Sequence, residues 1–158
     1  MDKTDTHELN RFKTKAANLE KEWRVTIQSP NGGLESLLTE LGNQIPLIQG
    51  PYDNCMYVRE GGYQRFRALE GSHAGNEGTI QATATSEVIF TIPPNPSLLE
   101  DVFETVFAIH VQEEPTIHVE EIWGSRSNFL DDKDNPNRYW NRPNAQALHG
   151  DIVGTSKD

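Results

Sequence analysis

The densest group of side chains that could bind a metal lies between residues 110 and 120. It contains His110, Glu113, Glu114, His118 and Glu120. Imidazole nitrogens and carboxylate oxygens are common ligands of divalent transition metals, but several of them must converge on one point. A metal site formed by His110, Glu113, Glu114 and His118 is therefore one hypothesis for this segment.

The other interpretation of the same segment is structural. A helical pattern ends at His110, and Pro115 follows where a helix cannot continue. A histidine at a helix end can hydrogen-bond the terminal carbonyl groups and interacts favourably with the helix dipole. We favour this interpretation, in which His110 and Glu113 fix the joint between a helix and a strand.

Three other segments have residue types that suggest chemistry, but their context argues against it. The loop 71–78 has three glycines, yet no strand-to-helix junction and no following lysine support a phosphate-binding loop. The run Asp131-Asp132-Lys133-Asp134-Asn135 lacks the glycine and glutamate of a calcium-binding loop, so we expect a solvated acidic loop. Cys55 is the only cysteine and is interpreted as a small hydrophobic residue. No nucleophile elbow is present.

Composition limits the class of partner. The chain has 158 residues and a formal charge of −10, with 14 Lys and Arg against 24 Asp and Glu. This charge argues against nucleic acid or an anionic membrane as the main partner. No apolar run approaches the ~20 residues of a membrane span, no signal sequence is visible, and a lone cysteine suits a reducing compartment. We expect a cytoplasmic protein with one domain.

The first half of the chain predicts two helices and a strand in alternation. Residues 4–22 have a narrow apolar stripe at helical spacing, which predicts an N-terminal helix. Residues 23–28 alternate between apolar and polar side chains before Ser29-Pro30, as a half-buried strand does. Leucines at helical spacing over 34–41 predict a helix, with Gly42 as its C-terminal cap.

The second half predicts three or four strands and one more helix. Residues 45–59 are apolar but interrupted by two prolines, which predicts an irregular or edge strand, and 60–63 predict a turn before a short strand at 65–69. Residues 79–92 give the longest strand pattern. The next helix begins at Asn95 or at Ser97, whose Glu100 would complete a capping box, and it reaches His110.

The last strand follows Pro115. Its alternation changes parity at Glu120-Glu121, which predicts a β-bulge or the strand's end. The polar remainder has three anchors, Tyr139, Trp140 and Leu148, and is expected to form an extended arm, clamped by Tyr139 and Trp140 on a neighbouring subunit. The element order is thus βαββαβ.

This order predicts an α+β fold, a ferredoxin-like βαββαβ sandwich with both helices on one face of an antiparallel sheet. The expected organisation is an N-terminal helical extension at 1–22, the ferredoxin-like domain at 23–123 and the extended C-terminal arm at 124–158.

Several glycines and a histidine-to-proline segment occur in a fixed order along the predicted domain: Gly50, Tyr52, Cys55, Gly62, Phe66, Glu70-Gly71-Ser72, Gly78, the strand end from Val88 to Pro93, and His110 with Glu113-Glu114-Pro115. In this order the chain from Trp23 to Trp123 resembles the Nif-three-like (Ngg-interacting factor) family, and more narrowly its small inserted domain, which also occurs as a free-standing protein. Val111 and Gln112 stand where that family has Pro and Tyr. Within the motif, Gly62, Gly71, Gly78 and Pro115 are expected to be structural.

The resemblance carries expectations about function. The inserted domain is similar in fold to CutA and PII proteins, which implies a subunit that tends to trimerise. Full-length family members have a two-metal site in a larger domain whose motifs are absent here, so that activity is not transferred. We expect a non-enzymatic, homo-oligomeric binding or regulatory module, with a trimer as the expected form and ligand sites in subunit clefts near the loops at 61–78.

The main alternative is a metal-binding protein that uses His110, Glu113, Glu114 or His118. No resident cofactor is expected under the first hypothesis, and a divalent metal would be the cofactor under the second. A hydrolase is the third and weakest alternative.

Overall fold

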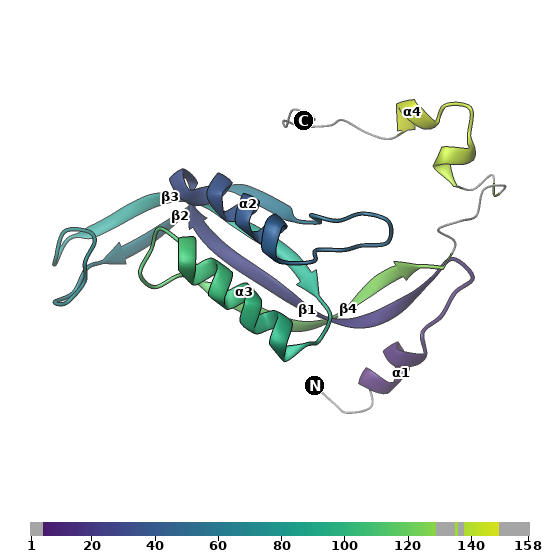
Figure 1. Cartoon of the computed structure of the whole chain (residues 1–158), viewed down its shortest axis with the longest axis horizontal. Helices are drawn as coiled ribbons and strands as arrows, with labels where there is room; N and C mark the ends of the chain where they lie inside the picture. The colour runs from purple at the N-terminus through teal and green to yellow at the C-terminus, as the bar shows by residue number, and fades with distance from the viewer. Residues whose placement is uncertain (1–4, 129–134, 136–137, 149–158) are drawn as a thin grey trace.

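The computed structural model describes residues 5–128, 135 and 138–148, which form a four-stranded antiparallel sheet with two helices packed on one face (Figure 1). The elements in chain order are α1 (Asp5–Arg11), β1 (Ala17–Pro30), the 3-10 turn η1 (Asn31–Gly33), α2 (Leu34–Gln44), β2 (Tyr57–Arg67), β3 (Ile80–Ile92), α3 (Pro96–Ile109), β4 (Ile117–Ser127), the 3-10 turn η2 (Tyr139–Asn141) and α4 (Ala145–Leu148).

The sheet has the predicted ferredoxin-like topology. Its strand order is β2-β3-β1-β4, and each neighbouring pair is antiparallel. The two central strands are β1 and β3. Helix α2 connects β1 to β2 and helix α3 connects β3 to β4, and in neither case are the two connected strands hydrogen-bonded to each other. The predicted α+β arrangement is therefore confirmed.

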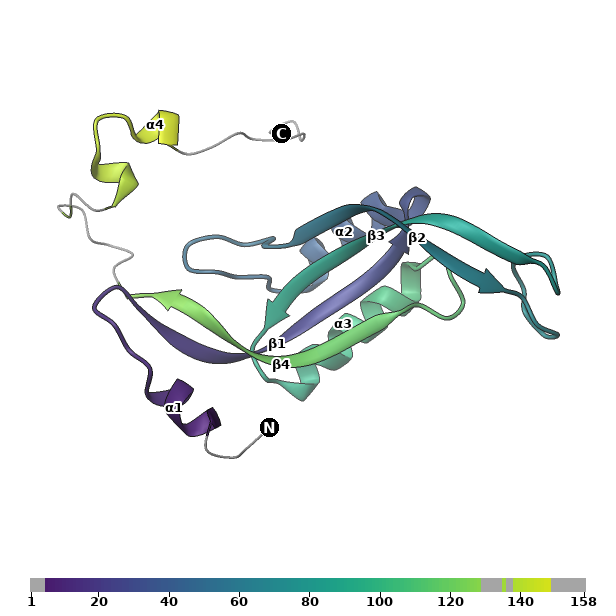
Figure 2. The same ribbon diagram turned by 180° about the vertical axis from the view of Figure 1, so that it is seen from behind.

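The core lies between the sheet and the helices α2 and α3. Alternate residues of β1 and β3 point into it, and leucines of α2 and valines of α3 close it from the other side, as period-two and helical spacing require. The fully buried side chains include Val25, Ile27, Leu37, Leu41, Val88, Ile92, Val102 and Val106. Viewed from behind, the sheet lies in front of both helices (Figure 2).

Two pairs of strands continue beyond this core. At one end β1 and β4 form a ribbon whose pairing reaches Ala17 and Ser127, and at the other β2 and β3 form a hairpin whose pairing reaches Arg67 and Ile80 (Figure 1). Within the ribbon the carboxylate of Glu22 is buried and pairs with Arg126. Gly124 leaves space for it, because an added Cβ would collide with the Glu22 carboxylate.

The predicted N-terminal helix is shorter than expected. Helix α1 ends at Arg11, and β1 already begins at Ala17, so the expectation of one helix over 4–22 is wrong from residue 12 onward. The hydroxyl of Thr14 accepts hydrogen bonds from the N–H groups of Ala16 and Ala17, which turns the chain into the strand. Pairing with β4 outweighs the narrow apolar stripe that suggested a helix.

Three local predictions are also corrected. Gly42 lies inside α2, which continues to Gln44, and is not its cap. Residues 60–63 are no turn, because β2 continues through them with a register shift between Arg59 and Gly62, a β-bulge. Conversely β4 runs from Ile117 to Ser127 with an unbroken register and has no bulge at Glu120-Glu121.

The start of α3 is resolved in favour of Asn95. Its side-chain oxygen accepts hydrogen bonds from the N–H groups of Ser97 (3.0 Å) and Leu98 (3.4 Å), and Pro96 occupies the first turn. The helix ends at Ile109, so His110 stands at its C-cap and Pro115 beyond it, as predicted.

The predicted acidic loop at Asp131–Asp134 lies outside the described residues. In the described part of the arm, the guanidinium of Arg138 lies 5.6 Å from the centre of the Trp140 ring, a cation–π contact. Among the described residues no helix is long and apolar enough to cross a membrane.

The capping arrangement gives a direct test. Asn95→Ala is expected to lower the free energy of unfolding by about 1 kcal/mol, because two N–H groups of the first turn lose their acceptor. Ser97→Ala is the matched control and should change it by less than about 0.5 kcal/mol. Urea unfolding followed by circular dichroism measures both, and a larger effect at Ser97 would contradict the assigned cap.

Candidate functional site

Both ring nitrogens of His110 are occupied by hydrogen bonds within the protein. Nδ1 accepts the backbone N–H of Gln112 at 3.0 Å, and Nε2 lies 2.7 Å from the backbone carbonyl of Gln28. Because Gln112 donates to Nδ1, Nε2 must carry the proton and donate to Gln28. His110 is therefore held as a neutral imidazole between the end of α3 and β1.

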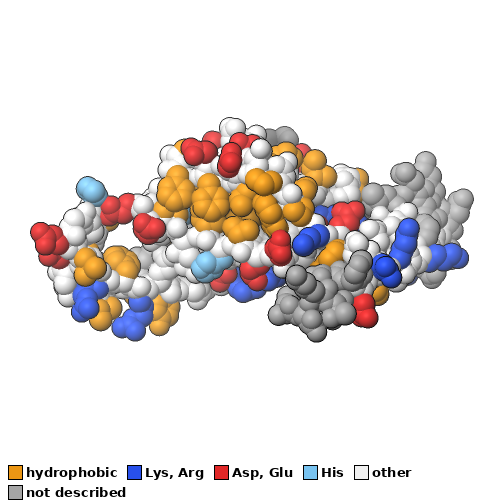
Figure 3. Space-filling view, turned by 90° about the horizontal axis from the view of Figure 1, so that it is seen from below, with side chains coloured by type: hydrophobic (Ala, Val, Ile, Leu, Met, Phe, Trp, Pro, Cys, Tyr) orange, Lys and Arg blue, Asp and Glu red, His pale blue; other side chains and the backbone are white. Residues whose placement is uncertain are grey.

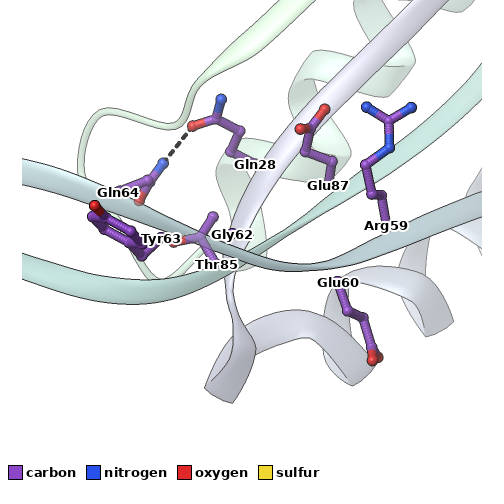
Figure 4. A pocket seen from close by; sticks show the side chains of 8 residues that line it. All are labelled: Gln28, Arg59, Glu60, Gly62, Tyr63, Gln64, Thr85 and Glu87. Atoms are coloured by element: carbon purple, nitrogen blue, oxygen red, sulfur yellow. Dashed lines mark hydrogen bonds between the residues drawn. The ribbon is translucent and has the colours of Figure 1, made fainter.

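The side chain of Gln112 returns to the same strand through a second glutamine. Its Nε2 donates to Oε1 of Gln64 at 2.7 Å, and Nε2 of Gln64 donates to Oε1 of Gln28 at 2.8 Å. The second of these bonds is visible in Figure 4. Together with the bonds of His110, these contacts form a closed ring through Gln28, His110, Gln112 and Gln64. We call this set the polar ring.

The polar ring joins three elements that are distant in sequence. Gln28 lies near the end of β1, Gln64 lies on β2 beyond its bulge, and His110 and Gln112 lie in the joint between α3 and β4. A further bond from the N–H of Gln28 to the carbonyl of Thr116, at 3.0 Å, fixes the far end of this joint. The joint is thus attached to the sheet at both of its ends.

A second contact attaches the loop at 68–79 to the same joint. The carboxylate of Glu113 accepts the backbone N–H of His73 at 2.7 Å, and its other oxygen lies 2.7 Å from Nδ1 of His73. The hydrogen bond and charge of Glu113 raise the pKa of His73 above its ordinary 6.5, and the His73 side chain and N–H lower the pKa of Glu113 below 4.5. Because the His73 side chain is 88% exposed, this contact is sensitive to salt.

The other two candidate ligands do not join this arrangement. Glu114 is exposed, and His118 is an exposed residue of β4 opposite Thr26 of β1. Across the described residues no three His, Cys, Asp or Glu side chains lie close enough together to hold a metal ion. The structure therefore brings His110 and Glu113 to one joint but does not gather the four proposed ligands.

The motif residues expected to be structural have defined positions. Gly62 lies at the β-bulge, where an added Cβ would approach the carbonyl of Thr85 to 3.3 Å. Gly71 and Gly78 have φ values of 94° and 78°, a backbone conformation that favours glycine. Pro115 is buried within the joint, two residues before β4 begins.

These contacts shape one wall of an open groove of about 830 Å³. The other wall is the outer half of β2, which contributes Tyr63, Arg65, Phe66 and Arg67. Leu69, Ser72 and Ala74 of the loop and Val111 to Glu114 of the joint complete the lining. A smaller cavity of about 120 Å³ lies beside the bulge, between Gln28, Arg59 and Glu87 (Figure 4). We take the larger groove as the candidate site.

The groove is equipped for binding rather than for covalent chemistry. His73 with Glu113 resembles the base and orienting carboxylate of a catalytic triad. In the described part of the chain, however, no hydroxyl or thiol is hydrogen-bonded to the His73 ring, and the ring is open to water. The groove offers guanidinium groups, aromatic rings and amides instead.

Sequence reasoning identified His110 and Glu113 but missed Gln28, Gln64 and His73. Glutamine is common on strand surfaces, and none of these residues belongs to a motif. The only signal was indirect: Gln28 closes the first predicted strand, and His73 lies in a loop with three glycines.

Comparison with known proteins supports the fold. No family model matches the chain, and no curated protein matches it in sequence. Among solved structures it is similar to a Bacillus cereus protein related to NIF3, with 23% identity, a TM-score of 0.56 and coverage of 72% of this chain. The match spans only 28% of that protein's length.

Two further similarities are weaker. CutA1 from Oryza sativa has 20% identity and a TM-score of 0.48, covering 66% of this chain and 82% of its own. CPII from Thiomonas intermedia K12, a structure with bound ADP and bicarbonate, has 17% identity and a TM-score of 0.45, covering 69% and 93%. The expected similarity in fold to a Nif-three-related protein is confirmed by the Bacillus cereus structure.

The pair of His73 and Glu113 predicts a pH dependence. The pKa of His73 is raised in the folded protein, so its contribution to the stability of the folded state is complete below pH 6.5 and is lost as the pH rises through the raised pKa. That of Glu113, whose pKa is lowered, is complete above pH 4.5 and is lost as the pH falls through its lowered pKa. The contact is therefore strongest between pH 4.5 and 6.5.

An NMR titration of the imidazole signals checks this expectation. The pKa of His73 should lie above 6.5 in the wild type and return towards 6.5 in Glu113→Gln. Glu114→Gln, the neighbouring carboxylate, is the matched control and should leave it unchanged. Equal titration of His73 in all three proteins would show that the pair does not form.

The polar ring predicts that His110 matters to stability. His110→Phe leaves the carbonyl of Gln28 and the N–H of Gln112 without their partner, which is expected to cost about 1–3 kcal/mol of unfolding free energy. His118→Phe replaces an exposed imidazole and should change it by less than about 0.5 kcal/mol. Chemical unfolding measures both, and equal effects would exclude the structural role of His110.

Proposed function

We propose that this protein is a non-enzymatic, oligomeric binding module whose ligand occupies the groove between β2 and the joint at 110–116. The observation that carries the proposal is the groove itself, about 830 Å³ in volume, with one wall held by the polar ring and by the contact of His73 with Glu113. Walls fixed in advance lower the entropy cost of binding.

The lining indicates the kind of ligand. Arg65 and Arg67 provide positive charge, and Phe66 and Tyr63 provide aromatic surface. Guanidinium groups bind anionic groups through paired hydrogen bonds, and aromatic rings bind planar or apolar groups. A small anionic ligand with an aromatic or apolar part fits this combination best.

The proposed module is a homo-oligomer, with a trimer as the expected form. Both strand extensions reach beyond the helix-covered core, and Tyr57 and Tyr63 of β2 are among the exposed aromatic residues. Extended strands with exposed apolar side chains are typical of surfaces that a second subunit covers. A cytoplasmic location belongs to the same proposal.

The metal-binding alternative receives no support from the described geometry. A metal on His110 would have to displace the Gln112 N–H from Nδ1 or the Nε2 proton that bonds Gln28. Calorimetry with zinc, copper and manganese tests it. Saturable binding that is lost in His110→Ala and His118→Ala would favour this alternative over the binding module.

An anionic aromatic probe tests the groove. Anilinonaphthalenesulfonate should bind the folded protein saturably, which is measured as an increase in its fluorescence. Its affinity should fall at least about tenfold in Arg67→Glu, because this substitution replaces charge attraction by repulsion. Arg59→Glu makes the same charge change on β2 outside the groove and is the matched control. Equal affinities in both variants would argue against the groove as the site.

A further inference from the structure

Helix α3 exposes an apolar surface with an acidic border. The rings of Phe103 and Phe107 are stacked with their centres 6.3 Å apart, and Phe107 is 55% exposed. Glu100 and Glu104 precede the two rings by three residues, and residues three apart are neighbours on a helix surface. We call these four residues the α3 stripe. Figure 3 views the molecule from the side of α3 and shows hydrophobic side chains gathered in one band, with acidic side chains beside them.

The α3 stripe has no basic neighbour to balance its charge. The sequence contains no Lys or Arg between Arg67 and Arg126. Within the described residues no basic side chain lies at ion-pair distance from Glu100 or Glu104. Exposed aromatic rings beside unpaired carboxylates are typical of a surface that a partner with apolar and basic side chains covers.

The segment that leads from α1 into β1 has this complementary composition. Residues 9–16, which we call the arm, contain Arg11, Lys13 and Lys15 and no acidic residue, which makes them the most basic stretch of the chain. Phe12 stands among these cations and is 50% exposed. None of the three cations lies at ion-pair distance from a carboxylate of the described residues. The arm therefore offers an exposed aromatic ring and unpaired positive charge.

The structure holds the arm away from the α3 stripe of its own chain. The hydroxyl of Thr14 accepts the N–H groups of Ala16 and Ala17 and turns the arm into β1. The ribbon of β1 and β4 then extends beyond the core, and α1 lies at its outer end, apart from α3 (Figure 1). The main contact of α1 within the chain is with β1. Phe12 and the cations of the arm are thus left to meet the surface of another molecule.

We propose that the arm of one copy packs on the α3 stripe of a second copy. Phe12 lies against the rings of Phe103 and Phe107, and the cations of the arm pair with Glu100 and Glu104. Aromatic pairs stabilise a contact beyond the area that they bury. With a formal charge of −10 on each copy, most of the surface repels a second copy, so a basic arm selects where the two meet.

The second copy is the favoured occupant because every copy carries both surfaces. Two copies that exchange arms in both directions form a closed assembly, which leaves no arm or stripe uncovered. No residue of the arm or of the α3 stripe lines the groove of the proposed function. The contact is therefore separate from the ligand site and leaves Arg65 and Arg67 free for an anionic ligand.

Carbodiimide cross-linking of the full chain tests the contact. The reagent joins a lysine amine to a carboxylate as an amide, and takes up the lost oxygen as a urea, only where the two groups touch. Unlabelled copies and copies labelled with a heavy nitrogen isotope are unfolded together, refolded and treated. Mass spectrometry should find peptides that join Lys13 or Lys15 to Glu100 or Glu104. These peptides should include pairs of one labelled and one unlabelled chain.

Two results would overturn the proposal. Linked peptides whose two parts always carry the same label would show that the arm packs on its own chain, and absence of these links would show that the contact does not form. Glu100→Gln with Glu104→Gln removes the carboxylates and should abolish the links. Glu70→Gln with Glu77→Gln changes two exposed loop carboxylates and is the matched control, which should leave the links unchanged.

Mixing charge-reversed variants gives a second measurement. Lys13→Glu with Lys15→Glu, and separately Glu100→Lys with Glu104→Lys, should each weaken association at least about tenfold in sedimentation, because like charges then face each other. An equimolar mixture of the two variants should regain association, since each reversed arm meets a stripe of opposite charge. No weakening in either variant, or no recovery in the mixture, would contradict the contact. Circular dichroism verifies that each variant is folded.

The outcomes distinguish this contact from the proposed function. A wild type that stays monomeric at micromolar concentrations overturns the contact and the proposed oligomer together, whereas ligand binding in the groove is judged by the fluorescent probe. An oligomer without links between the arm and the α3 stripe overturns the contact alone.

Discussion

The backbone of Gln28 has to find hydrogen-bond partners on a side where its sheet neighbour has already ended. Strand β4 begins at Ile117, which pairs with Ile27, so one residue further along β1 the ladder has no strand to continue with. The carbonyl of Thr116 accepts the Gln28 N–H, and the imidazole of His110 donates to the Gln28 carbonyl. Buried or half-buried backbone groups without partners are costly, so this requirement fixes the path of the joint. The groove, in turn, takes its wall from that path.

Regular patterns in the sequence predicted the core well. Alternation located β1 and β3, helical spacing located α2 and α3, and together they predicted the ferredoxin-like topology. The failures occurred where long-range pairing decides the structure. Residues 17–22 form a strand because β4 pairs with them, and nothing local in the sequence shows that partner. Likewise two glycines at 61–62 suit a turn as well as the bulge that the pairing with β3 creates.

The candidate site was predictable only in part, for a related reason. His110 and Glu113 were predicted as candidates because imidazole and carboxylate groups can bind metals and transfer protons. Gln28 and His73, which bond His110 and Glu113, and Gln64, which bonds Gln112, are 40 to 82 residues away from their partners in this segment, and no spacing rule connects such positions. The site consists largely of side-chain amides and backbone groups. Such groups occur along the whole chain, so the sequence does not indicate which of them take part in the site.

The β-bulge of β2 has a consequence for how the sequence can change. Before the bulge Arg59 is opposite Glu87, and after it Gly62 is opposite Thr85. The one extra residue in β2 therefore shifts the pairing register with β3 for every following residue of β2. In the uninterrupted phase Gln64 would take the place opposite Ala82 that Arg65 now holds, and would point to the other face of the sheet. Loss of one residue at the bulge would therefore move every side chain of β2 after it to the opposite face of the sheet. We therefore expect β2 to tolerate single substitutions more readily than the insertion or deletion of a single residue before Gly62.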